Sequence, residues 1–157
     1  MFGKLSPSEI EELLNQQFVG RIGCHANETT YVVPISYAYD GTYIYGHALE
    51  GKKIDMMRNN PNVCFEVDNT RNLSNWQSVI AMGIYEELAK GPEWNEAMQK
   101  LEARAFPVLT SETMRLHSQW PFPSGNADNI TGIVFRIRLI EKSGRFEKSD
   151  GQYYYAT

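Results

Sequence analysis

The sequence lacks the features that mark several large classes of protein. No stretch approaches the run of about 18 consecutive apolar residues that a membrane helix needs, and the first residues lead into charged helical sequence rather than a signal peptide. Two cysteines, Cys24 and Cys64, are too few for a disulfide framework. Fifteen basic residues against 19 acidic ones give a net charge of −4, without the basic excess of nucleic-acid-binding proteins. We therefore expect a cytoplasmic protein that has no membrane span and binds no nucleic acid.

Motifs of several enzyme classes are missing as well. The sequence has no glycine-rich phosphate loop of the Walker or dinucleotide type, no Gly-x-Ser-x-Gly elbow and no His-Glu-x-x-His motif. The histidines are scattered, and a site built from Cys24, His25 and His47 falls short of the four ligands of structural zinc. We therefore predict no metal site.

The remaining composition is that of one globular domain. The chain has 157 residues, of which 42% are hydrophobic and 22% are charged, so residues 1–157 are expected to form a single domain. The aromatic content stands out, with three Trp, nine Tyr and seven Phe.

Helical and strand patterns alternate along the chain. Ser6, Pro7 and Glu9 form a helix start with a capping box. Further helices are expected over residues 51–60 and from residue 91, and short strands over 19–26, 31–39, 42–47, 62–67, 77–88 and 132–139. Pro34 interrupts the second strand, which predicts an edge, a bulge or a point where something other than a strand approaches. The pattern predicts a mainly β, α+β fold: a six-stranded barrel with peripheral helices.

The segment 45–67 is the most informative part of the sequence. It reads as a strand, a glycine-containing turn, a helix that opens with Lys52 and Lys53, and another strand. The N–H groups of a helix start, next to two ammonium groups, suit a phosphate, although without an anion such cations oppose the helix dipole. A solvated basic turn is the alternative interpretation.

This segment resembles the phosphate-binding segment of the pyridoxamine 5′-phosphate oxidase-like flavoproteins, the FMN-binding split-barrel superfamily, and is most similar to its nitroimidazole-resistance-protein branch. Other matching pieces follow in the same order, namely Gly20-Arg-Ile-Gly23, Tyr31 to Gly41, Trp76-Gln-Ser-Val-Ile-Ala-Met-Gly83 and Val134 to Gly144. The resemblance implies a six-stranded split barrel that forms a homodimer, with FMN in clefts between the subunits and a small-molecule substrate beside it.

The resemblance also implies roles for individual residues. Lys52 and Lys53 match the residues that hold the FMN phosphate, and His47 lies where the family's turn approaches the flavin, so it is the candidate for substrate polarisation or proton supply. The further residues implied in flavin binding are Val33, Pro34 and Ile35 along the ring, and Gln77 and Ser78 from across the dimer cleft. His47 could instead be an ordinary strand-end histidine, and Gln77 and Ser78 could face solvent. Trp120 contacts the flavin or packs in the core or dimer seam.

The expected function is electron transfer from a reduced nicotinamide to a small acceptor, nitroaromatic or similar, by an FMN-dependent oxidoreductase. The alternative is a flavin-binding protein without turnover, for storage, sensing or regulation. FAD is less favoured than FMN because the chain is acidic and has no further basic cluster, and F420 or haem could also occupy a split barrel. The oxidases that act on pyridoxamine phosphate carry an arginine where this chain has Tyr31, and they end in a basic strand that is missing here. We therefore do not expect this protein to oxidise pyridoxamine phosphate.

Overall fold

The computed structural model describes residues 1–104 and 131–149 of the chain. Within them, eight strands form one antiparallel sheet in the order β3-β2-β6-β7-β8-β5-β4, and β1 pairs with β8. The strands are β1 (Phe2–Lys4), β2 (Val19–Ala26), β3 (Thr29–Ser36), β4 (Ala38–Tyr39), β5 (Tyr43–Ala48), β6 (Asn62–Asn72), β7 (Asn75–Leu88) and β8 (Ile133–Glu147). The helices are α1 (Pro7–Gln16), α2 (Lys52–Asn59) and α3 (Pro92–Ala103).

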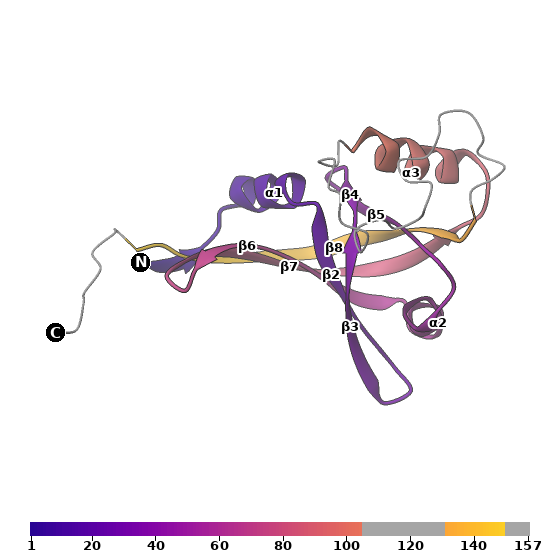
Figure 1. Cartoon of the computed structure of the whole chain (residues 1–157), viewed down its shortest axis with the longest axis horizontal. Helices are drawn as coiled ribbons and strands as arrows, with labels where there is room; N and C mark the ends of the chain where they lie inside the picture. Colours follow the sequence, from indigo (N-terminus) through magenta and orange to yellow (C-terminus); the bar gives the residue numbers. More distant parts are fainter. Residues whose placement is uncertain (105–130, 150–157) are drawn as a thin grey trace.

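The helices are peripheral to the sheet, as expected. Figure 1 shows α1 and α3 above the long strands β6, β7 and β8, while α2 lies at the lower right beside the β2–β3 hairpin. This mainly β arrangement confirms the predicted α+β fold, which is consistent with a split barrel. The short strands β1 and β4, of three and two residues, are additional to the six that the sequence pattern separated. None of the helices in the described ranges is long and apolar enough to cross a bilayer.

The start of α1 confirms the predicted capping box. The Ser6 side chain accepts a hydrogen bond from the Glu9 N–H, and the Glu9 carboxylate accepts one from the Ser6 N–H at 2.7 Å. This pairing satisfies two N–H groups that the helix cannot satisfy itself. The apolar face of α1, with Leu13 and Leu14 at 2% and 0% exposure, then packs onto the sheet.

Two buried clusters hold the helices to the strands. The larger one joins α1, α2 and the sheet, and includes Ile22, Phe65 and Phe135. The smaller one lies under α3, where Trp94 and Leu101 pack against Val134. Because adjacent strand residues face opposite sides of a sheet, Val134 and Phe135 join different clusters.

A bulge explains why β8 is longer than the sequence pattern indicated. The partners of Met82 and Gly83 on β7 are Glu141 and Leu139, so Ile140 is the extra residue on β8. Up to Leu139 the odd-numbered residues face the larger cluster, whereas beyond Ile140 it is even-numbered positions such as Gly144 that turn inward. The alternation therefore breaks at the bulge while the strand continues to Glu147.

Arg136 on β8 is largely enclosed rather than solvated. Its side chain is 13% exposed, its Nε donates to Glu86 at 2.6 Å, and its guanidinium lies 4.2 Å from the centre of the Tyr43 ring. The even-numbered face of this half of β8 is covered by α3, which encloses Arg136.

A glycine on β5 is required by a cross-strand aromatic ring, and this gives the first prediction. Gly46 pairs with Phe135, and a Cβ at Gly46 would lie 2.5 Å from the Phe135 ring. Gly46→Ala should therefore lower the free energy of unfolding by about 1–3 kcal/mol through overpacking. The measurement is urea denaturation of the two proteins without added ligand.

Gly91→Ala is the control, because the nearest atom to a Cβ there is 3.9 Å away. It should lower the free energy of unfolding by no more than about 1 kcal/mol, the preference of a helix N-cap for glycine over alanine. Equal effects of the two substitutions would show that the Phe135 ring does not constrain Gly46.

Candidate functional site

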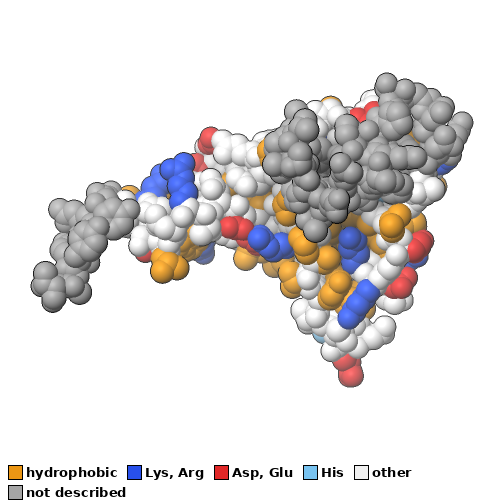
Figure 2. Space-filling view, viewed as in Figure 1, with side chains coloured by type: hydrophobic (Ala, Val, Ile, Leu, Met, Phe, Trp, Pro, Cys, Tyr) orange, Lys and Arg blue, Asp and Glu red, His pale blue; other side chains and the backbone are white. Residues whose placement is uncertain are grey.

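A cavity of about 310 Å³ lies where β3, the end of β5 and the start of α2 meet. Figure 2 shows Lys and Arg side chains set among hydrophobic ones on the face where α2 lies beside the β2–β3 hairpin. The residues that line the cavity are Tyr31, Val33, His47, Ala48, Leu49, Glu50, Gly51, Lys52 and Lys53. The cavity thus brings together Val33, His47 and both lysines from the sequence-based prediction.

The start of α2 leaves backbone donors uncommitted at this cavity. Gly51 is the N-cap, and no side chain caps the helix there. The first backbone bond of the helix runs from the Asp55 N–H to the Gly51 carbonyl at 3.1 Å. The N–H groups before Asp55 are therefore those that an α-helix cannot satisfy itself. Together with the helix dipole they favour an anion.

Lys53 supplies a cationic group that is partly removed from water. Its side chain is half-buried, and this burial lowers its pKa from the usual value because desolvation disfavours the ammonium form. Within residues 1–104 and 131–149, no carboxylate forms an ion pair with it. A half-buried charge without a counter-ion is unfavourable, and a bound anion would compensate it.

Lys52 contributes the second positive charge. Its Nζ lies 4.8 Å from the centre of the Tyr31 ring, a cation–π distance. In the described part of the chain this ammonium also has no carboxylate partner. Both lysines are therefore available to the same anion.

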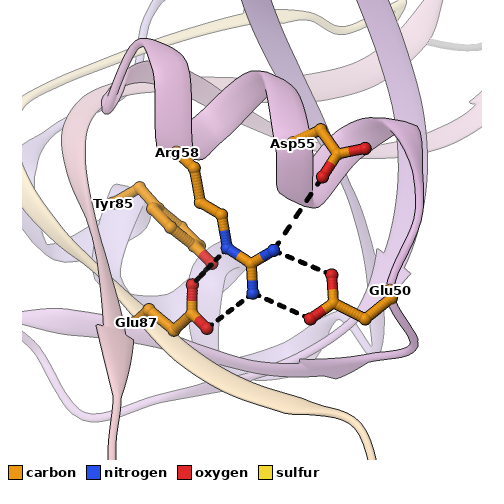
Figure 3. A network of polar contacts seen from close by, with 5 residues as sticks. All are labelled: Glu50, Asp55, Arg58, Tyr85 and Glu87. Atoms are coloured by element: carbon orange, nitrogen blue, oxygen red, sulfur yellow. Dashed lines mark hydrogen bonds and ion pairs between the residues drawn. The ribbon is translucent and has the colours of Figure 1, made fainter.

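The acidic residue of the cavity lining is bound elsewhere. Both oxygens of the Glu50 carboxylate accept hydrogen bonds from the Arg58 guanidinium, at 2.8 Å each. Arg58 in turn contacts Glu87 on β7 (Figure 3). As a result, Glu50 does not neutralise the neighbouring lysines.

The three predicted β3 residues have different environments. Val33 is half-buried and lines the cavity, Pro34 is exposed, and Ile35 is 4% exposed in the core. Of the three alternatives for Pro34, an edge strand, a bulge or the approach of something other than a strand, the structure shows the first, because β3 is an edge strand. Because the Tyr37 N–H bonds to the Phe18 carbonyl, the alternating antiparallel pattern directs the Pro34 nitrogen away from β2.

His47 is buried at the wall of the cavity. It is 6% exposed, and its Nε2 lies 2.6 Å from the Thr131 carbonyl oxygen. Since a carbonyl oxygen only accepts, Nε2 carries the proton of this bond. This bond fixes the orientation of the imidazole. A strand-end histidine without such a bond would have no fixed orientation.

Gln77 and Ser78 are not part of this cavity in the single chain. Gln77 lines another cavity of about 410 Å³, together with Asn69, Arg71, Asn75, Trp76, Glu147, Lys148 and Ser149. The Ser78 hydroxyl donates to Glu66 at 3.1 Å. These residues belong to the β6–β7 end of the sheet, which Figure 1 shows at the opposite end from α2. Trp120 lies outside the described residues.

Sequence reasoning missed several residues of the cavity lining, among them Tyr31, Leu49 and Glu50. Tyr31 was noted only as a departure from the family pattern, and Leu49 and Glu50 were not singled out. Tyr31 and Val33 share one face of β3, so the period of two along the strand was the available signal. For Glu50 the signal was its place directly before the glycine and the two lysines.

Comparison with known proteins gives a consistent family assignment. Residues 6–145 match the family model described as pyridoxamine 5′-phosphate oxidase. Over 84 residues the chain is 33% identical to the uncharacterized protein RA0666 of Rhizobium meliloti, and the match spans 54% of this chain and 56% of that protein.

Solved structures resemble this fold over most of its length. An FAD-binding protein of Mesorhizobium loti is 31% identical, with a TM-score of 0.71 over 94% of this chain and 99% of its own. A candidate 5-nitroimidazole antibiotic resistance protein of Bacteroides thetaiotaomicron has a TM-score of 0.69 at 20% identity, covering 93% of this chain and 87% of its own. The FAD-binding protein of Mycobacterium smegmatis has a TM-score of 0.66 at 21% identity, covering 94% and 100%. The last two show similarity of fold alone.

Proposed function

This chain belongs to the pyridoxamine 5′-phosphate oxidase family, and we propose that it is an FMN-dependent oxidoreductase. The observation that carries the proposal is the half-buried ammonium of Lys53, which forms no ion pair within residues 1–104 and 131–149, beside Lys52 and the uncapped start of α2. This arrangement suits the 5′-phosphate of a flavin nucleotide. A flavin bound there would supply two-electron redox chemistry between a reduced nicotinamide and an acceptor.

The chain's own residues bind and orient the cofactor in this proposal. Lys52, Lys53 and the first N–H groups of α2 hold the phosphate. Val33 and Leu49 offer an apolar wall for the ring system. His47, held through Nε2 by the Thr131 carbonyl, lies beside the same cavity and is the candidate for contact with a substrate.

The charge of the site favours FMN, although two structural relatives are named as FAD-binding. A phosphate monoester such as that of FMN carries close to two negative charges near neutral pH. Each phosphate of the FAD diphosphate bridge carries about one. Two lysines that converge on one cavity match the monoester dianion better. FAD remains the second candidate because of those relatives, and mass analysis separates the two.

The proposed partner is a second copy of the chain, which would bring Gln77 and Ser78 to the flavin. One surface of the sheet carries an apolar row in register, running from Val32 through Cys64 to Met82. Ile140 and Ile80 extend this row, and Val32, Met82 and Ile140 are 63%, 48% and 63% exposed. A groove of about 460 Å³ follows it. Large exposed aliphatic side chains gathered on one sheet face are typical of an interface.

The first test of the proposal is the cofactor itself. The purified protein should be yellow, with the absorption bands of oxidised flavin, and heat should release a compound with the mass of FMN. A colourless protein that takes up no added FMN at micromolar concentration contradicts the proposal. With the flavin present, oxidation of reduced nicotinamide on adding a nitroaromatic acceptor supports an enzyme, and no turnover supports storage, sensing or regulation.

The phosphate site predicts a selective loss of FMN affinity. Lys52→Ala combined with Lys53→Ala removes two charge-assisted contacts to the phosphate, each worth roughly 1.5–3 kcal/mol. FMN should therefore bind at least about a hundredfold more weakly, whereas riboflavin, which has no phosphate, should bind almost as before. Fluorescence titration of both ligands measures the ratio.

Arg136→Ala is the control for this pair, because Arg136 is bound to Glu86 under α3 and does not line the cavity. It should leave the ratio of the two affinities unchanged. If the double lysine variant binds FMN within about threefold of the wild type, the phosphate is held elsewhere.

The apolar row predicts a dimer that one charge disrupts. Met82→Glu places a carboxylate in the centre of the proposed interface, where burial without a partner costs several kcal/mol. The dimer dissociation constant should rise roughly a hundredfold or more, and the flavin should be lost with it. Analytical ultracentrifugation of wild type, Met82→Glu and the apolar control Met82→Leu tests this. A wild-type monomer that retains flavin would exclude the dimer site.

A further inference from the structure

We infer that Arg58 is a positioning residue of the proposed phosphate site: it holds the Glu50 carboxylate away from Lys52 and Lys53 and so keeps both lysines available to an anion. This inference rests on the proposed function and adds to it a residue that lies outside the cavity lining. It arises from the network in Figure 3.

The Arg58 guanidinium is the centre of two bidentate contacts. On one side, Nη1 and Nη2 donate to the two oxygens of Glu50, at 2.8 Å each. On the other side, Nε and Nη2 donate to the two oxygens of Glu87, at 2.7 and 2.8 Å. Figure 3 shows Arg58 between the two carboxylates, with Asp55 farther away at 3.8 Å from Nη1. The planar fork of arginine makes both contacts at once, which the single ammonium of a lysine cannot do.

The network ties the turn before α2 to the sheet. Glu50 precedes the helix, Arg58 is in its last turn, and Glu87 is on β7. The Tyr85 hydroxyl donates to Glu87 at 3.3 Å. The contacts to Arg58 hold the pKa of Glu87 below its usual value, which keeps this carboxylate charged. Glu87 is therefore a fixed anchor on a strand, and Arg58 extends from it to the turn.

Glu50 is close enough to the two lysines to compete with a bound anion. Glu50 lines the cavity, two residues before Lys52 and three before Lys53. Its side chain is 60% exposed, so its position is set by the contacts to Arg58 rather than by packing. Without Arg58, the attraction of opposite charges would direct this carboxylate to Lys52 and Lys53. It would then compete with a phosphate for the same two ammonium groups.

The test compares FMN and riboflavin affinities in variants of the full-length protein. Arg58→Ala should weaken FMN about fivefold, the factor expected if Glu50 forms one exposed ion pair with each lysine. Riboflavin affinity should change by less than about twofold because Glu50 has no phosphate to displace. Arg58→Gln, which keeps most of the side-chain stem, should give the same selective loss and serves if the alanine variant fails to fold.

The rescue variant separates this role from a merely structural one. In Arg58→Ala combined with Glu50→Gln, the competing charge is gone, and FMN affinity should return to within about twofold of the wild type. The loss in Arg58→Ala should also shrink in high salt, because the competition is between exposed charges. Arg136→Ala should leave the FMN-to-riboflavin ratio unchanged.

Three results would overturn the inference: equal weakening of FMN and riboflavin in Arg58→Ala, no rescue by Glu50→Gln, or no loss of FMN affinity at all. A wild-type protein that does not distinguish FMN from riboflavin would instead overturn the proposed phosphate site itself. The two failures are therefore distinguishable in one set of titrations.

Discussion

The pairing of β5 with the first half of β8 positions the candidate site. β8 pairs with β7 along its length, with β5 before the bulge and with β1 near its end, so it connects both halves of the sheet. His47 and Ala48 are the last residues of β5 that β8 holds, opposite Val134 and Ile133. The turn to α2 begins immediately afterwards, so the place of the lysines depends on this register. Because of the bulge at Ile140, one strand packs against α3 before the bulge and lies against α1 after it.

Positive charge is concentrated at this turn although the chain as a whole carries −4. Lys52 and Lys53 open a helix whose dipole opposes them, and Lys53 is also half-buried. Each of these features is unfavourable alone, and the nearby Glu50 that could relieve them is bound to Arg58. Because the Glu50 carboxylate does not neutralise Lys52 and Lys53, the site keeps a local excess of positive charge that a bound anion would compensate. This local excess, rather than the net charge of the chain, supports the proposal of a phosphate ligand.

The sequence predicted much of the fold because its signals are local. The capping box at Ser6, the strand over residues 19–26 and the helix within residues 51–60 each depend on neighbouring residues, and the structure confirms them. The continuation of β8 past Leu139 was missed because a bulge reverses the alternation. Part of the site could also be predicted from the sequence, because Lys52 and Lys53 are adjacent. The clamp of Glu50 by Arg58 was not, because it depends on Glu87, 29 residues beyond Arg58 on another element.

Tyr31 bears on which substrate could share the cavity with a flavin. The Tyr31 ring lies 4.8 Å from the Lys52 ammonium, at the position where the resemblance to oxidases of pyridoxamine phosphate implies an arginine. A substrate with its own phosphate would add close to two negative charges to the cavity proposed to hold the flavin phosphate. The described lining offers two cations, and a tyrosine adds none. Repulsion between the two phosphates would therefore remain uncompensated, and this favours an uncharged acceptor.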